Sequence, residues 1–279
     1  MILKDTIKQA SQQLRNHNIL SHEIDVQIIL SNTMGVTREF LLLNENISIS
    51  DKIRIKFNYL LKRRINNEPV AYITGKKEFW TSDFLVNKST LVPRPETELL
   101  IYKIVDFYKN KKINILDIGT GSGCILLTIL KELGFARGIG IDISPQAIQM
   151  AKLNATKLNL LNRSKFKVFD IGKFNSEKFD LIVSNPPYVP SRDIKNLQKD
   201  ITNYEPLVAL NGGHDGLDLI KEVIYKSINL LKKNGLLAIE IGNQQYFRVS
   251  NILKHRGYRE LSKQYDYKNN VRCIISTKI

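Results

Sequence analysis

The sequence has few of the features that mark secreted and membrane proteins. It holds two cysteines among 279 residues, Cys124 and Cys273, whose separation gives neither a metal-binding spacing nor a disulfide framework. A reducing compartment is therefore expected. No apolar run approaches the length of a membrane span, and the charged, amphipathic start MILKDTIKQASQQL is not a signal peptide. We expect a cytoplasmic protein that binds neither a membrane nor a metal.

Acidic residues are the scarcer charge. The chain has 42 Lys and Arg against 27 Asp and Glu, which gives a net charge of +15 and a pI near 9.6. Such a surplus attracts nucleic acid or ribosomes. The basic residues are spread along the chain without a long block, so a general use of lysine explains the charge equally well. We expect a monomer that does not bind nucleic acid directly.

Residues 1–75 predict a small helical domain. Apolar residues recur there at helical spacing, and Ser21, Thr37 and Ser50 are each placed to cap a helix. Gly35 would end the second helix, and Pro69 would end the fourth. No strand-like alternation interrupts this region.

The remainder of the chain predicts a hairpin followed by an α/β domain. In the linker, residues 76–92, the stretch EFWTSDFLV is aromatic and β-branched around a polar turn, which favours a β-hairpin. From residue 93 to 279, strand and helix patterns alternate, and a helix should begin at Pro95. INILDIG, GIGID, KFKVFD, FDLIVSN and GLLAIEIG read as strands, and the tail after Gly257 as two more. This order is typical of a Rossmann-like, doubly wound and largely parallel sheet.

A glycine-rich turn follows the first of these strands. The residues are Gly119, Thr120, Gly121, Ser122 and Gly123, and a helix comes directly after them. Such a turn brings backbone N–H groups close to a ligand. Its spacing is neither the dinucleotide pattern nor the lysine-containing phosphate loop, which favours a ligand without phosphate such as S-adenosylmethionine. A turn that needs glycine only for packing would have the same sequence.

Two acidic residues end the next strands. Asp142 follows GIGI about twenty residues after the glycine turn, where a carboxylate can accept hydrogen bonds from both ribose hydroxyls. Ser144 and Pro145 should cap and open the following helix. Asp170 ends KFKVFD and could contact an adenine amino group, although it is equally suited to a plain cap. The glycine turn, Asp142 and Asp170 should all lie at the carboxyl edge of the sheet, where ligands bind in such folds.

The strand FDLIV runs into Asn185, Pro186, Pro187 and Tyr188 at the same edge. Two successive prolines hold the backbone extended and remove two N–H donors. The Asn185 side-chain carbonyl and nearby main-chain carbonyls remain as acceptors beside a flat aromatic ring. Such a rim suits a planar N–H₂ group and would orient it for attack on a methyl carbon. An amide nitrogen and the exocyclic amine of a base both fit this chemistry.

Several stretches together resemble the release factor glutamine methyltransferase family, from about residue 69 to the end. They are PVAYITGKKEFW, LVPRPETELL, LDIGTGSGCI, GIDISPQAI, SNPPYVP, EPLVALNGGHDGLD and IEIGNQQ. The resemblance implies a class I S-adenosylmethionine-dependent methyltransferase that modifies the glutamine amide in the Gly-Gly-Gln loop of class 1 peptide-chain release factors, yielding S-adenosylhomocysteine. It also implies that the helical domain helps to bind the release factor.

The resemblance assigns roles to particular residues. Residues 119–123 would wrap the methionine part of the cofactor and Asp142 its ribose, while Asp170 and Ile171 would flank the adenine. Asn185, at the junction of cofactor and substrate, and the Pro186 carbonyl would hold the glutamine amide. Pro187 and Tyr188 would complete the substrate site, with the Tyr188 ring packed against the amide.

Two positions depart from the family pattern, and three other functions stay open. Thr81 and Asn269 stand where the family commonly has glycine, although asparagine tolerates a left-handed backbone. A ribosomal-protein glutamine methyltransferase would share the site. An adenine-N6 DNA methyltransferase would use the same acceptors on a flipped base, but no target-recognition region is evident. A non-enzymatic ribosome- or RNA-binding protein would have no reason to keep the glycine turn, Asp142 and the Asn-Pro-Pro-Tyr motif together.

Overall fold

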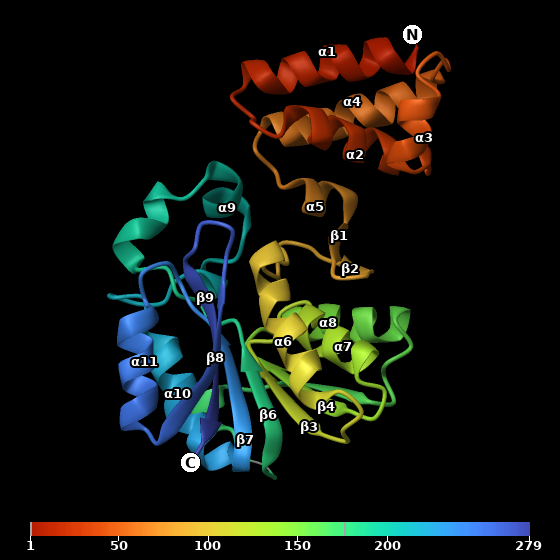
Figure 1. The fold of residues 1–279 in the computed structure, drawn as a ribbon. Coiled ribbons are helices and arrows are strands. Elements are labelled where there is room, and N and C mark those ends of the chain that lie inside the picture. Colours follow the sequence, from red (N-terminus) through yellow and green to blue (C-terminus); the bar gives the residue numbers. More distant parts are fainter. Residues whose placement is uncertain (1, 176) are drawn as a thin grey trace. The chain divides into compact units, whose positions relative to one another are not determined.

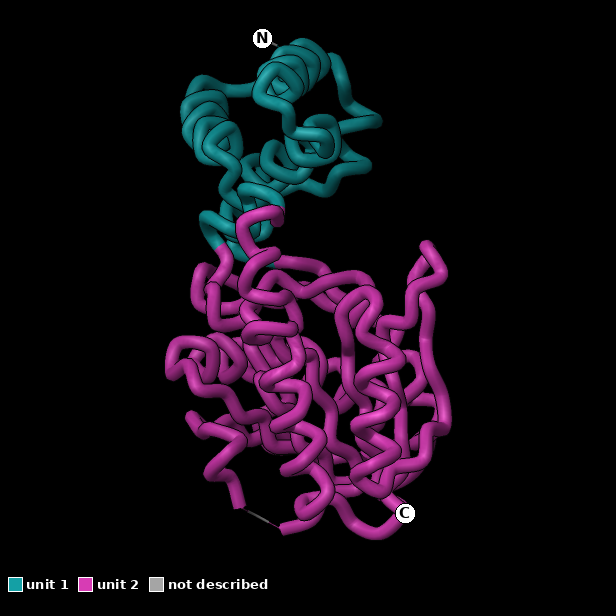
Figure 2. The backbone as a smooth tube through the Cα atoms, turned by 90° about the vertical axis from the view of Figure 1, so that its left-hand side faces the viewer, with its two compact units in different colours: residues 1–76, 198–204 teal, residues 77–197, 205–279 magenta. Residues whose placement is uncertain are grey.

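The structure is a computed structural model that describes residues 2–175 and 177–279. The chain divides into two compact units, shown in different colours in Figure 2. Unit 1 comprises Met1–Lys76 together with Gln198–Tyr204, and unit 2 comprises Lys77–Leu197 together with Glu205–Ile279. The short segment 198–204 therefore belongs with the N-terminal helices although it lies far along the sequence.

Unit 1 is helical. Its helices are α1 (Leu3–Asn16), α2 (His22–Met34), α3 (Arg38–Leu43), α4 (Asp51–Ile65), α5 (Val70–Thr74) and α9 (Lys199–Tyr204). Apolar faces of the N-terminal helices form one core that includes Leu14, Ile29 and Phe57. Inside it, Arg64 Nε donates to Asp25 Oδ2 at 2.7 Å, and both side chains are buried. The Tyr204 hydroxyl of the α9 segment donates to the Asn66 carbonyl at 2.9 Å.

The expected helix ends are mostly confirmed. Thr37 and Ser50 accept hydrogen bonds from the backbone N–H groups of their own first turns, and Gly35 ends α2 in the left-handed conformation. The expected cap at Ser21 is wrong, because its hydroxyl donates to the Asp25 carboxylate at 2.7 Å instead. Helix α5, directly after Pro69, was not expected.

Unit 2 is built on a seven-stranded sheet, which confirms the expected fold class. The hairpin strands are β1 (Lys76–Phe79) and β2 (Ser82–Leu85), and the sheet strands are β3 (Asn114–Ile118), β4 (Arg137–Asp142), β5 (Ser164–Val168), β6 (Phe179–Ser184), β7 (Leu231–Glu240), β8 (Tyr258–Tyr265) and β9 (Val271–Lys278). The strand order is β5-β4-β3-β6-β7-β9-β8; β9 runs antiparallel to both of its neighbours, β7 and β8, and the other pairs are parallel. Parallel strands β3, β4 and β6 thus end at one edge.

Helices cover both faces of this sheet (Figure 1). One layer holds α6 (Glu98–Tyr108), α7 (Cys124–Glu132) and α8 (Pro145–Lys157), and the other holds α10 (Asp218–Leu230) and α11 (Tyr246–His255). Successive residues of β3 enter opposite cores, Ile115 on the first side and Leu116 on the second. Burial on both faces explains why these strands read as continuous apolar runs.

Short 3₁₀ turns connect the elements near the carboxyl edge. They span Pro95–Thr97, Ile171–Lys173, Ser191–Asn196 and Leu207–Ala209. The first confirms that a helix begins at Pro95, since it runs directly into α6. Between β8 and β9, Asn269 adopts a left-handed backbone with φ of 60°, so this turn is kept without glycine. In the described part of the chain, no helix is long and apolar enough to cross a membrane.

Candidate active site

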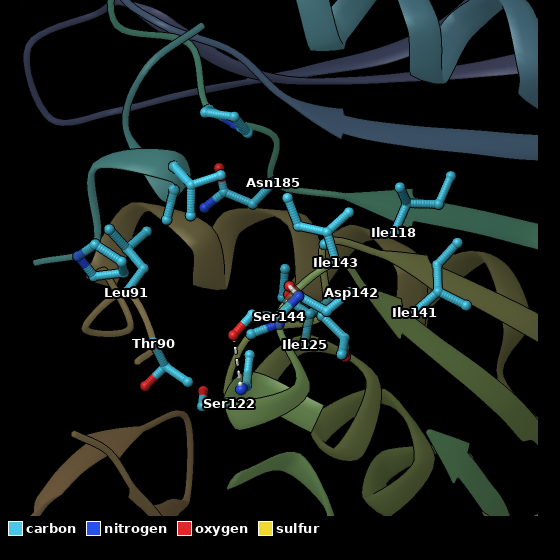
Figure 3. Close-up of a pocket in the computed structure, with 18 of the residues that line it drawn as sticks. Thr90, Leu91, Ile118, Ser122, Ile125, Ile141, Asp142, Ile143, Ser144 and Asn185 are labelled. Carbon is cyan, nitrogen blue, oxygen red and sulfur yellow. Dashed lines mark hydrogen bonds between the residues drawn. The ribbon is translucent and has the colours of Figure 1, made fainter. Parts of the chain in front are cut away.

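A cavity of about 310 Å³ lies in unit 2 at the carboxyl edge of the parallel strands (Figure 3). It falls in the size range of small-molecule sites. Among the residues expected to bind a ligand, those that line the cavity are Gly119, Thr120, Gly121, Ser122, Asp142, Asp170, Ile171, Asn185 and Pro187. Gly123, Pro186 and Tyr188 do not line it. One cavity therefore brings together residues that follow four successive parallel strands.

The glycine turn has a backbone that other residues rarely adopt. Gly119, Gly121 and Gly123 have φ of 71°, 54° and 79°, all in the left-handed region that favours glycine. Gly123 is also packed tightly, because an added Cβ would lie 3.2 Å from the Ala151 Cβ. This glycine serves the contact between α7 and α8, whereas the first two shape the cavity wall.

Asp142 ties the turn to the next strand. One carboxylate oxygen accepts from the Gly121 N–H and the other from the Ser144 N–H, both at 2.9 Å. Ser144 caps α8 as expected, with its hydroxyl accepting from the Ala147 N–H. Burial raises the pKa of Asp142, while these backbone N–H groups oppose the shift. Each oxygen keeps a lone pair for a ligand hydroxyl.

Asp117 is a buried acid for which the sequence suggested no role. Its Oδ2 accepts from the Thr120 hydroxyl at 2.6 Å, and its Oδ1 has no partner among the described residues. Burial raises its pKa to about 7; the Thr120 hydroxyl opposes this shift and the charge of Asp142 adds to it. Its position two residues before the glycine turn was the available signal.

Asp170 caps a turn and also lies at the cavity, and its expected contact with an adenine stays a prediction. Its Oδ1 accepts from the Gly172 N–H at 2.8 Å, which caps the 3₁₀ turn Ile171–Lys173. The same residue and Ile171 line the cavity. Beside them, the cavity walls include Ile143 and Phe169, whose side chains are 56% and 40% exposed. Apolar surface of this kind suits a flat base.

Asn185 lies on the opposite wall with one end of its amide occupied. Its Nδ2 donates to the Thr97 hydroxyl at 3.2 Å, whereas its Oδ1 accepts no hydrogen bond from the described residues. Pro186 is buried behind the wall, and Pro187 lines the cavity. The Asn185 Oδ1 is thus left to accept a hydrogen bond from a ligand.

Tyr188 points its hydroxyl into a buried polar cluster. Arg272 Nη2 donates to this hydroxyl at 3.0 Å, and the hydroxyl donates to Glu240 Oε1 at 3.3 Å. Burial raises the pKa of Tyr188, with Glu240 adding to the shift, so it stays a phenol. Its expected packing against a substrate amide stays a prediction.

A frame of loops explains the two prolines after β6. The Val189 N–H donates to the Leu210 carbonyl, and the Gly212 N–H donates to the Val189 carbonyl at 2.9 Å. Gln245 Nε2 donates to the Tyr188 carbonyl at 3.0 Å. Gly212 is required here, because an added Cβ would lie 2.8 Å from the Pro187 carbonyl oxygen. The next backbone N–H donor after the two prolines that forms such a bond is that of Val189. The missing N–H groups of the prolines therefore remove no hydrogen bond from the sheet.

An ion pair between the half-buried Arg94 and the buried Glu205 joins two segments of the cavity wall. Arg94 Nη2 lies 2.6 Å from Glu205 Oε1, and the Val92 N–H donates to Glu205 Oε2 at 3.3 Å. The pair joins the segment before α6 to the segment that carries Pro206 and Val208, and both segments line the cavity. These two residues stand 111 positions apart, and no local pattern pairs them.

These features fit S-adenosylmethionine. The cavity offers a turn with small residues, a carboxylate that can accept from a ribose diol, and apolar surface near Asp170. No feature of the wall resembles a phosphate loop, since the turn lacks the lysine of that motif.

Comparison with known proteins defines first the class and then the family. A model described as "Methyltransferase domain" matches residues 109–274, and one described as "PrmC N-terminal domain" matches residues 5–75. Among solved structures, a ribosomal protein L11 methylase from Lactobacillus delbrueckii subsp. bulgaricus is 19% identical with a TM-score of 0.51, over 67% of this chain and 81% of that one. A methyltransferase from Pyrococcus furiosus is 15% identical with a TM-score of 0.51, over 81% and 97%. The fold is that of a class I methyltransferase, whose cofactor is S-adenosylmethionine.

Curated relatives give the family. The release factor glutamine methyltransferase of Clostridium acetobutylicum is 36% identical over 283 residues, 100% of this chain and 99% of that protein. The protein of the same name from Caulobacter vibrioides is 36% identical over 96% and 94%. This chain belongs to the release factor glutamine methyltransferase family.

Proposed function

We propose that this enzyme transfers a methyl group from S-adenosylmethionine to the side-chain amide nitrogen of the glutamine in the Gly-Gly-Gln loop of class 1 release factors. The amide nitrogen attacks the methyl carbon, a C–N bond forms and the C–S bond breaks. The bonding electrons go to sulfur, which leaves S-adenosylhomocysteine, and the nitrogen loses one proton to solvent. The observation that carries the proposal is that Asn185 lines the same cavity as the glycine turn and Asp142, with its amide nitrogen already bonded to Thr97.

In this proposal, the Asn185 Oδ1 and the Pro186 carbonyl accept the two N–H groups of the substrate amide. An amide lone pair is delocalised and a poor nucleophile, so orientation and stabilisation of the developing positive charge carry the catalysis. Gly119, Gly121 and Asp142 hold the cofactor, and Asp170 and Ile171 lie at its adenine. The matched N-terminal region supports a role for the helical unit in binding the release factor. We further propose a cytoplasmic monomer that requires no nucleic acid.

Methyl-labelled S-adenosylmethionine tests the reaction. The acceptors are a purified class 1 release factor, its loop Gln→Ala variant, a ribosomal protein and duplex DNA. We expect label only in the release factor with its glutamine. Equal labelling of the Gln→Ala variant, or labelling of DNA, would contradict the proposal.

The variant Asn185→Ala tests the site. We expect kcat to fall by about 10²- to 10³-fold, the usual loss for one positioned hydrogen-bonding group. The affinity for S-adenosylmethionine, measured by calorimetry, should stay unchanged. A collapse of cofactor binding would show that Asn185 serves the cofactor rather than the substrate.

A further inference from the structure

A chain of hydrogen bonds runs from Asn185 into the protein interior. Asn185 Nδ2 donates to the Thr97 hydroxyl at 3.2 Å, and that hydroxyl donates to Glu240 Oε2 at 2.6 Å. Thr97 is 2% exposed and Glu240 is fully buried at the end of β7. These residues are separated by 88 and 143 positions in the sequence, so the fold alone brings them together.

The Thr97 hydroxyl is not used as a helix cap. Threonine at the start of a helix ordinarily accepts a backbone N–H. Thr97 occupies this position for α6, yet its backbone is helical and its side chain makes no capping bond. Its hydroxyl is instead shared between the carboxylate behind it and the amide in the cavity wall.

The directions of these bonds follow from counting protons. Arg272 Nη2 donates to the Tyr188 hydroxyl, so the tyrosine proton is directed to Glu240 Oε1. Arg272 also faces Glu240 at 3.9 Å. Burial raises the pKa of Glu240, while the Thr97 hydroxyl, the charge of Arg272 and the Tyr188 hydroxyl oppose the shift. Both carboxyl oxygens accept from hydroxyl groups and the permanent cation of Arg272 lies beside them, which together favour the ionised carboxylate.

An ionised carboxylate only accepts, and a hydroxyl has a single proton. The proton of Thr97 therefore goes to Glu240, and Thr97 can only accept from the Asn185 amide. If the amide turned over, its oxygen would face the Thr97 lone pairs and its N–H₂ would face the substrate N–H₂. Both contacts would be repulsive.

We propose that Thr97 and Glu240 are positioning residues that fix the orientation of the Asn185 amide, so that Oδ1 and not Nδ2 is presented to the substrate nitrogen. The inference rests on the proposed function, in which Asn185 accepts a hydrogen bond from the substrate amide. Glu240 accepts the Thr97 proton and so fixes the direction of that hydroxyl. The Thr97 oxygen can then only accept from Asn185, which fixes the orientation of the Asn185 amide. Neither residue is required to touch the substrate.

The test compares four variants of the full chain. Thr97→Val removes the hydroxyl at constant shape, and Thr97→Ser keeps it. Glu240→Gln places an N–H₂ where an acceptor stood. Thr128→Val is the matched control, because Thr128 is a buried threonine whose hydroxyl has no partner among the described residues.

Kinetics with the release factor give the first readout. We expect kcat of Thr97→Val and Glu240→Gln to fall by about 10- to 100-fold, as for a misoriented reacting group. The cofactor affinity and the KM for the release factor should change little. Thr97→Ser should recover most of the loss, and the double variant Thr97→Val/Glu240→Gln should be no slower than its worse single variant. Thr128→Val should match the wild type.

The side-chain N–H₂ resonance of Asn185 gives a readout that needs no substrate. One of its protons should be protected from exchange in the wild type and in Thr128→Val, and should lose this protection in Thr97→Val. Normal kcat in Thr97→Val beside an inactive Asn185→Ala would overturn the inference while leaving the proposed function intact. Unprotected protons in the wild type would overturn it as well. Absence of methyl transfer by the wild type would instead contradict the proposed function, and the resonance would still decide the orientation.

Discussion

Gly121 donates its backbone N–H to the Asp142 carboxylate at 2.9 Å, which joins the ends of two neighbouring strands within the cavity wall. The same carboxylate accepts from the Ser144 N–H that leads into α8. Its position is thus set by the backbone on both sides. A ligand that hydrogen-bonds to this carboxylate meets a group that is already oriented.

The variant Asp142→Ala should weaken binding of S-adenosylmethionine by about 10- to 100-fold, since hydrogen bonds to charged groups contribute about 1.5–3 kcal/mol. Calorimetry measures this change. The matched control is Asp180→Ala, which removes a carboxylate bonded to the Asn114 N–H and Lys232 near the start of β6, away from the carboxyl edge. The control should bind the cofactor as the wild type does. Equal affinity in Asp142→Ala would rule out its assigned contact with the ribose.

Asp117 should make stability depend on pH. Its carboxyl has an ordinary pKa of 3.8 and a folded pKa of about 7, raised mainly by burial, so the folded protein binds this proton more tightly than the unfolded chain does. The resulting stabilisation is complete below the unfolded pKa and is lost as pH rises from about 4 to about 7. Urea unfolding without cofactor, for the wild type and Asp117→Asn at about pH 5 and about pH 8, measures it. The stability of the wild type relative to the variant should fall with rising pH, and a constant difference would disprove the shift.

Removing one partner of the buried Asp25–Arg64 ion pair should destabilise the protein more than replacing both partners. Both side chains are buried, and Arg64 also donates to the Glu68 carbonyl. Asp25→Ala leaves a buried cation and should lower the free energy of unfolding by about 3–5 kcal/mol. The double variant Asp25→Leu/Arg64→Met should lose less, because no charge remains unpaired. Denaturant unfolding of both compares them, and a more severe loss in the double variant would show that the pair contributes net stability.

The β8–β9 turn should tolerate glycine and reject a branched residue at position 269. Asn269 has φ of 60°, and its N–H donates to the Asp266 carbonyl at 3.0 Å. Asn269→Gly should change the free energy of unfolding by less than about 0.5 kcal/mol, whereas Asn269→Val should cost about 1–2 kcal/mol. Thermal unfolding of the pair tests this. Equal stabilities would mean that the turn rearranges when the residue changes.

Local patterns predicted the parts of the molecule whose cause is local. Strands such as β3 are apolar on both faces, the glycine turn needs three left-handed residues, and Ser144 caps the helix that follows it. The Ser21 cap failed for a local reason of another kind, since its hydroxyl found Asp25 one turn ahead. Helix α5 was missed because five residues carry too little periodicity to distinguish a turn of helix from a loop.

The support behind the cavity wall could not be predicted in this way. Thr97, Glu240 and Gln245 contact Asn185 or Tyr188 across sequence separations of 52 to 88 residues. Thr97 even carries a misleading local signal, because a threonine at the start of a helix suggests a cap. Only the order of strands, which places β7 beside β6, brings these side chains behind the wall.

The path of the chain between its two compact units limits how this protein can be divided. The chain passes from one unit to the other between residues 76 and 77, between 197 and 198, and again between 204 and 205. A fragment that starts after Lys76 therefore keeps α9 but loses the Asn66 carbonyl to which Tyr204 donates. A chimaera with a foreign helical region would present α9 with a surface it was not matched to. Exchange of the helical unit between relatives therefore requires grafting two separate stretches of sequence at once.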